Sequence, residues 1–343
     1  MHTCLHIIPE VIVVPGGRWR RAWPEVLACL EAARADPDVR HVLTLIGGSC
    51  FGREARALGA AEFERIAPPL SEPRRAARCL ERLIDATDPG MIVTWDAPTA
   101  SWVERLRGIP GRSARVDLSS GQVECRGLDP ETGEVLRHWV TLTPEPMMIP
   151  ACASRADLRA SLGLEGDTRL IGVLGDDPER GDTLMYALGM LGASGLRCVG
   201  LCARTEPRRG PLLRHVREHG QIRGICFSRA GPLPLWLACD VCLLASPPDR
   251  PASCAWTMIA RGLRAAGMPL ILAEDGPPDD PGDTRPPLMR ARSGSPMDLA
   301  RAARAFLAGH DRATGRLTPP AIGPQPLMGR QIVAALRDVE ALA

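Results

Sequence analysis

The sequence contains no lysine and no asparagine, so all 42 of its basic residues are arginine. The absence of lysine excludes Schiff-base catalysis by a lysine amine and excludes a P-loop lysine. Aromatic residues make up only 3% of the chain, whereas hydrophobic residues make up 45%. Aliphatic side chains must therefore fill the core. The bias toward arginine and alanine indicates the nucleotide composition of the source genome rather than a function.

A strong charge of either sign is also missing, because the net charge is only +2. A nucleic-acid partner is therefore not expected, since such proteins cluster basic residues on one face. No apolar run reaches the ~18 residues of a membrane span, and the N-terminus lacks a signal-peptide pattern. The 12 cysteines are scattered along 343 residues, unlike those of a small secreted disulfide scaffold. We expect a cytoplasmic protein with no integral membrane segment.

Patterns that bind metals are weak in this sequence. Cys239 and Cys242 form a C-x-x-C pair, but no second pair or nearby histidine supplies the other two ligands that zinc needs. His215 and His219 lie four residues apart on a predicted helix, among charged neighbours. We predict core packing for the cysteines and a solvated face for the histidines, with no metal and no cofactor.

Short apolar runs alternate with amphipathic stretches, which predicts repeated β–α units with parallel strands and hence an α/β fold. The length suits two domains. Residues 143–153 carry three prolines and no periodicity, so we place a linker there, between domains at 1–150 and 151–343. Predicted helices include 18–33, 74–84, 181–191 and 254–266, and predicted strands include 41–46, 91–95, 114–118, 169–174, 196–202, 241–245 and 269–273.

The second half contains the segments ADLRASLGL at 156–164, LPLWLACDVCLLAS at 233–246 and GLRAAGMPLILA at 262–273. In these segments it resembles glycosyltransferase family 4. The resemblance implies the GT-B fold, in which two Rossmann-like domains with parallel sheets face a central cleft. It further implies that the first domain binds an acceptor, here an unknown sugar or lipid, and that the second binds a nucleotide-sugar donor.

The resemblance also assigns donor-binding positions in the second half. Gly175, Arg180, Gly181 and Ser246 match places where the family binds the donor. Asp176 stands where the family carries a phosphate-binding cation, and an acid there disfavours a diphosphate.

Two glutamates that the family places eight residues apart fall here on Cys254 and Gly262. Asp249 is the nearby carboxylate that could replace one of them in catalysis, although it also suits a turn.

Two features of the first half are candidates for the same site. Gly16 and Gly17 follow a strand, where a turn without Cβ atoms lets the backbone approach a phosphate or sugar. They also fit an ordinary turn. Asp96 follows the strand at 91–95 and could act as a general base on an acceptor hydroxyl. An N-cap or turn role explains the same aspartate.

These residues together predict an enzyme that transfers a sugar from a nucleotide-sugar donor to an unknown acceptor. The lost glutamates and Asp176 leave a second possibility open, a non-catalytic protein that keeps the fold for binding. A sugar-nucleotide epimerase is a third possibility, because such enzymes can share the two-domain shape.

Overall fold

The computed structural model divides the chain into two compact units. The first consists of Met1–Met148, Ser253–Met258 and Gln325–Ala343, and the second of Ile149–Ala252 and Ile259–Pro324. The structure describes residues 3–9, 11–14, 18–47, 62–66, 72–106, 112–129, 131–143, 157, 159–160, 163–164, 166–175, 181–203, 225–228, 239–245, 254–265, 267–273, 288–291, 295–309 and 327–341.

The first unit is built on a seven-stranded sheet with the order β5-β4-β1-β6-β7-β8-β9. Its first five strands in this order run parallel, and β8 and β9 continue the sheet as an antiparallel hairpin beside β7. The predicted α/β class is therefore confirmed. The strands are β1 (Thr3–Pro9), β4 (Arg40–Ile46), β5 (Glu62–Ile66), β6 (Met91–Thr94), β7 (Ser113–Asp117), β8 (Gln122–Leu128) and β9 (Val135–Thr141).

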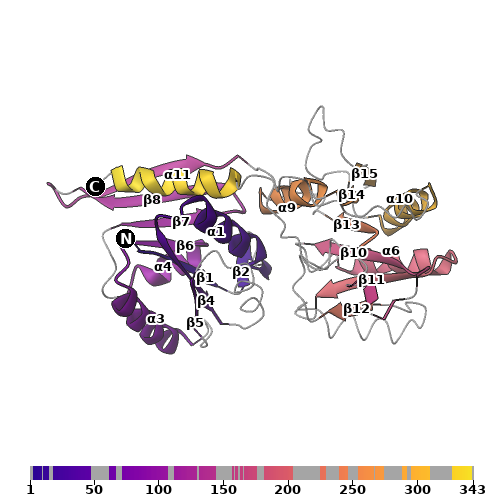
Figure 1. The fold of residues 1–343 in the computed structure, drawn as a ribbon, viewed down its shortest axis with the longest axis horizontal. Helices are drawn as coiled ribbons and strands as arrows, with labels where there is room; N and C mark the ends of the chain where they lie inside the picture. The colour runs from indigo at the N-terminus through magenta and orange to yellow at the C-terminus, as the bar shows by residue number, and fades with distance from the viewer. Residues whose placement is uncertain are drawn as a thin grey trace. The chain divides into compact units, whose positions relative to one another are not determined.

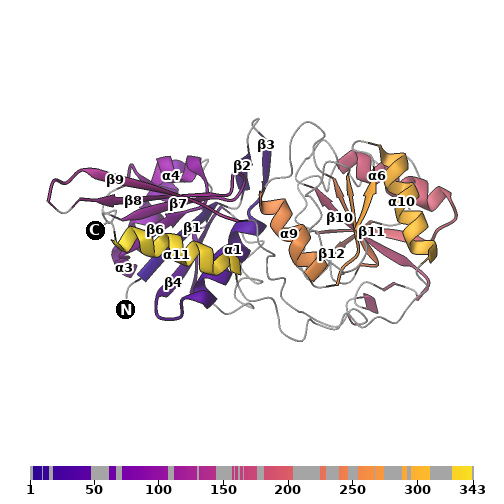
Figure 2. The same ribbon diagram turned by 90° about the horizontal axis from the view of Figure 1, so that it is seen from above.

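Alternate residues of β1 point to opposite faces of this sheet. Helices cover both faces. Leu5 and Ile7 pack against α3 (Pro73–Thr87) and Val103 of α4 (Ala97–Val103). Cys4 and His6 occupy the other face of β1. α1 (Trp23–Ala35) and α11 (Leu327–Ala341) lie side by side on that face, as Figures 1 and 2 show.

The last helix, α11, packs on the first unit although the sequence analysis placed residues 151–343 together in the second domain. It contacts α1, β7 and β8. Gly329 permits this packing, since a Cβ atom there would lie 2.3 Å from the main-chain carbon of Glu31. The sequence predicts this helix but does not predict the unit on which it packs, because its apolar face could pack on either sheet.

The segment between β1 and α1 differs from the sequence expectation. A helix was predicted from residue 18, but Arg18–Arg21 forms β3 and pairs antiparallel with β2 (Val11–Val14). The helix begins only at Trp23, with a proline in its first turn. The alternation of Arg18, Trp19 and Arg20 suits a strand as well as a helix face, and proline is favoured at a helix start.

The second unit is a six-stranded parallel sheet with the order β12-β11-β10-β13-β14-β15. The helices α6 (Gly181–Ala193) and α10 (Pro296–Gly309) pack together on one face. The helix α9 (Cys254–Ala265) is divided between the units, and its part from Ile259 onward belongs to the second. The strands are β10 (Arg169–Gly175), β11 (Cys198–Ala203), β12 (Ile225–Ser228), β13 (Val241–Ala245), β14 (Leu270–Ala273) and β15 (Leu288–Ala291).

Cys239 and Cys242 pack in the core of this second unit. Both are almost fully buried, and a Cβ atom on Gly172 would lie 2.7 Å from the Cys242 sulfur and 3.0 Å from the Cys239 sulfur. The two thiols thus fill the space that this glycine leaves open. Across the described residues, no helix is long and apolar enough to span a membrane.

Candidate functional site

The second unit has a topological switch point between β10 and β13. The chain leaves β10 toward β11 on one side of the sheet and later returns to β13 on the other side. Open parallel sheets bind ligands at the carboxyl ends of the two strands that flank such a point. The register pairs Gly175, the last residue of β10, with Ala245, the last residue of β13. The two segments that follow therefore leave the sheet as neighbours.

The donor-binding residues predicted in the second half belong to these segments of the sequence. Gly175 ends β10, and Gly181 is the first residue of α6. Helix N-termini present unpaired N–H groups and partial positive charge, which suit a diphosphate. Arg180, Ser246 and Asp249 lie outside the described residues, as does Asp176.

The two positions where the family carries glutamates lie on α9. Cys254 is the first residue of this helix, and Gly262 lies two turns further along. The sequence of α9 is CAWTMIARGLRA, so the helix carries no carboxylate. Any carboxylate that acts beside a donor sugar must come from another segment.

The first unit has its own switch point, between β1 and β6. These strands are neighbours in the sheet, yet the chain reaches β4 and β5 between them. Trp95 and Asp96 follow directly after β6 and lie at the carboxyl edge of the sheet. Gly16 and Gly17 lie outside the described residues, between the two paired strands β2 and β3.

Asp96 is the N-cap of α4. Its Oδ1 accepts a hydrogen bond from the Thr99 main-chain N–H at 2.9 Å. The residue is only 6% exposed. Burial raises the pKa of Asp96, the bonds from Thr99 lower it in part, and the nearby Glu25 and Asp117 raise it again. Asp96 can cap the helix and also have a raised pKa. A raised pKa is a property of carboxylate general bases that work near neutral pH.

Two polar groups next to Asp96 were not identified from the sequence. The indole nitrogen of Trp95 and the hydroxyl of Thr99 are buried and have no hydrogen-bond partner among the described residues. Buried polar groups are usually paired. The polar groups of Trp95, Asp96 and Thr99 come from a stretch of five residues. A sequence in which a strand is followed by Trp-Asp and then by the start of a helix could have predicted this group.

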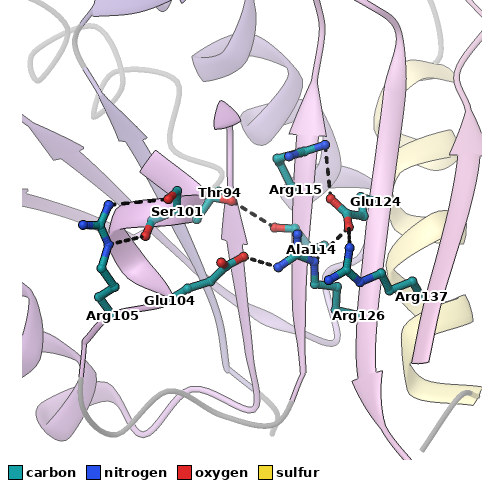
Figure 3. A network of polar contacts seen from close by, with 9 residues as sticks. All are labelled: Thr94, Ser101, Glu104, Arg105, Ala114, Arg115, Glu124, Arg126 and Arg137. Carbon is teal, nitrogen blue, oxygen red and sulfur yellow. Dashed lines mark hydrogen bonds and ion pairs between the residues drawn. The ribbon is translucent and has the colours of Figure 1, made fainter. Parts of the chain in front are cut away.

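Arginines of the first unit gather on β7, β8 and β9, where Figure 3 shows them around Glu124. Glu124 is almost fully buried and pairs with Arg115 at 3.1 Å, Arg126 at 2.9 Å and Arg137 at 3.7 Å. Arg126 also pairs with Glu104. Two carboxylates therefore offset three guanidinium groups. The arrangement joins three strands and leaves little net charge for an anionic ligand.

Metal-ligating side chains meet elsewhere in the first unit. Of the described residues, Cys4, His6 and His41 form the group whose ligand atoms all lie within 4.8 Å of one another. The sequence analysis missed this group because Cys4 and His6 are separated from His41 by the length of α1. The alternation of Cys4 and His6 along one strand was the available signal.

Comparison with known proteins supports the fold and goes no further. No protein-family model and no curated protein matches the chain. The chain is similar in structure to a glycosyltransferase from Rickettsia africae, with 10% sequence identity, a TM-score of 0.51 and coverage of 99% of this chain and 98% of that one.

Two further solved structures are similar over almost the full chain. A proposed UDP-N-acetylglucosamine 2-epimerase from Listeria monocytogenes has 10% identity, a TM-score of 0.52 and coverage of 98% of this chain and 96% of that one. The Anabaena protein HepE, solved with UDP-glucose, has 13% identity, a TM-score of 0.50 and coverage of 98% of both chains. The chain therefore has a GT-B fold of two Rossmann-like units, and membership of family 4 remains a prediction.

Proposed function

We propose that this protein transfers a sugar from a nucleotide-sugar donor to a sugar or lipid acceptor. The observation that carries the proposal is the pairing of Gly175 with Ala245, which brings two donor-type segments to the switch point of the second sheet. Similar folds belong to a glycosyltransferase and to a protein solved with UDP-glucose. The fold is compatible with several chemistries, so the proposal rests on this edge rather than on the fold.

In this proposal the second unit holds the donor. The N–H groups at the start of α6 bind the diphosphate, and Arg180 adds a charge-assisted bond. Gly175, Gly181 and Ser246 let the main chain and a hydroxyl reach the donor, and Asp249 acts beside the sugar in place of the missing glutamates.

The first unit supplies the acceptor side of the reaction. Asp96 takes the proton of the attacking acceptor hydroxyl, and its raised pKa suits that task near neutral pH. Gly16 and Gly17, in contrast, allow the main chain to approach the phosphate or sugar of the donor.

A binding protein without turnover is the second candidate, because α9 carries no carboxylate. Electrostatic stabilisation of the transition state is usually the largest catalytic term, and the loss of one such group costs roughly 2.7–4 kcal/mol. An epimerase is the third candidate, since one of the similar folds is a proposed epimerase of a UDP-sugar.

A thermal-shift panel of nucleoside diphosphates and nucleotide sugars, followed by product analysis, tests the proposal. A ligand that binds the folded state raises the melting temperature by mass action. We expect stabilisation by at least one nucleotide sugar and loss of its sugar when an acceptor is added. Binding without consumption would favour the binding protein, interconversion of free donors would favour the epimerase, and no binding to any donor would contradict the proposal.

A further inference from the structure

Cys4, His6 and His41 meet on the α1 side of the first sheet. The register pairs Cys4 with His41 on the neighbouring strand, and His6 follows two residues after Cys4 on the same face. His6 Nε2 lies 2.8 Å from His41 Nδ1. All three residues are at most 5% exposed. Cys29, on α1, is also fully buried, and after burial itself the proximity of Cys4 is what raises the pKa of the Cys29 thiol.

The two histidines are poorly satisfied as a simple hydrogen-bonded pair. The contact joins two ring nitrogens in a buried place, where a charged ring is unfavourable. Two neutral rings share one proton across the 2.8 Å contact. One outer nitrogen then keeps an N–H and the other keeps a lone pair, and neither His6 Nδ1 nor His41 Nε2 has a hydrogen-bond partner in the part of the chain that the structure describes. Buried polar groups of this kind normally have partners.

We propose that Cys4, His6, His41 and Cys29 bind one zinc ion. Thiolate and imidazole groups are the ligands of structural zinc sites, which are tetrahedral. With Zn–N bonds of about 2.0–2.1 Å, two tetrahedral nitrogen ligands lie roughly 3.3 Å apart. The facing nitrogens therefore need to separate by about half an ångström, and the two stacked rings need to turn so that both nitrogens point to the ion. Binding replaces the shared proton with the metal, and the two thiols release their protons to solvent.

In this proposal Cys29 is the fourth ligand, because charge balance calls for a second thiolate and Cys29 is the fully buried cysteine whose thiol interacts with that of Cys4. Its sulfur lies outside the group whose ligand atoms are within 4.8 Å of one another, so it must move toward the ion. Zinc with one thiolate and two neutral imidazoles would carry a net positive charge in a buried site, which is unfavourable. A second thiolate makes the centre neutral. The ring protons then lie on the outer nitrogens, which point away from the ion.

The position of the cluster indicates a structural role. Cys4 and His41 line a cavity of about 40 Å³ together with Thr3, Asp36 and Gly90. This cavity lies at the amino edge of the sheet, opposite the edge that carries Asp96. It offers a route for the ion to the cluster. A four-ligand site closed by protein side chains has no open position for a substrate, so the metal would tie β1, β4 and α1 together.

Cobalt substitution of the full-length chain tests this proposal. Apoprotein prepared with a chelator is titrated with Co²⁺ alone, followed by absorption, and zinc content is measured on protein purified without chelator. We expect one ion per chain, ligand-field bands of tetrahedral intensity and a thiolate-to-cobalt charge-transfer band. Cys4→Ser and His41→Gln should abolish the spectrum, and Cys29→Ser should roughly halve the charge-transfer band.

Cys79→Ser is the matched control, because Cys79 is a partly exposed cysteine of the same unit that lies outside the cluster. This variant should bind cobalt like the unchanged chain. Because a ligand variant could fail to fold, the unchanged chain is also melted with and without Zn²⁺, and zinc should raise its Tm. Absence of stoichiometric metal with no change in Tm, or an unchanged cobalt spectrum in Cys4→Ser, would overturn the proposal.

Discussion

Asp96 combines two roles that substitutions can separate. Asparagine is as good an N-cap as aspartate, so Asp96→Asn should keep the bond from the Thr99 N–H and be at least as stable as the unchanged chain at pH 7. Asp96→Ala loses the cap and should lose about 1 kcal/mol of stability. If Asp96 is the general base, both variants should lose sugar transfer by about 10²–10⁴-fold. Urea unfolding and a donor-consumption assay measure the two effects, and full activity in the asparagine variant would remove Asp96 from the chemistry.

The raised pKa of Asp96 also predicts a pH dependence of stability. An acid whose pKa is higher in the folded state binds more protons when folded, so stability falls as pH rises through the window above its usual 3.8. Burial, Glu25 and Asp117 disfavour the charged form, and the Thr99 bonds favour it. The stability of Asp96→Asn minus that of the unchanged chain should therefore grow as pH rises across this window and then level off. A difference that shrinks with increasing pH would contradict the assigned direction.

Arg180 tests the donor side at the same scale. A hydrogen bond between charged groups contributes about 1.5–3 kcal/mol, so Arg180→Ala should weaken nucleoside diphosphate binding by roughly 10-fold or more. Arg301→Ala is the matched control, since Arg301 is an exposed arginine of the same unit that pairs with Asp298 on α10. Calorimetric titration with the same diphosphate compares the two variants. Equal affinity in both would exclude Arg180 from the site.

The packing of α11 on α1 is a property of two elements and depends on one small residue. A methyl group on Gly329 would collide with the main chain of Glu31 and Ala32, which cannot move aside like a side chain. Gly329→Ala should therefore destabilise the first unit by about 1–3 kcal/mol, although alanine is the better helix former. Ala334→Ser, on the exposed face of the same helix, should change stability far less. Thermal unfolding of both variants gives the comparison.

Most elements could be predicted from the sequence because their signals are local. The run VCLLA of β13 is apolar throughout, and α9 begins after a proline-rich stretch and ends before Gly267. The strand β8 was missed because its sequence, QVECRGL, is not an apolar run and it buries the charged Glu124. The strand β3 was taken for the start of a helix. The partner of α11 could not be predicted, because docking depends on a complementary surface elsewhere in the chain.

The site residues that could be predicted from the sequence are those that lie at the ends of predictable strands and helices. Gly175, Gly181 and Asp96 each border an element whose period is clear in the sequence. The Cys4, His6 and His41 cluster was not, because it requires the register between β1 and β4. Register depends on the whole sheet, so side chains that meet across strands remain hidden in a single sequence.

At the scale of the whole molecule, the central claim is that a nucleotide binds at the switch point of the second sheet. The claim joins the strand order, the pairing of Gly175 with Ala245 and the start of α6 at Gly181. A crystal structure of the chain with UDP measures it most directly. The account predicts the diphosphate against the N-terminus of α6, beside the carboxyl ends of β10 and β13. A nucleotide bound elsewhere on the second unit, or on the first unit alone, would contradict it.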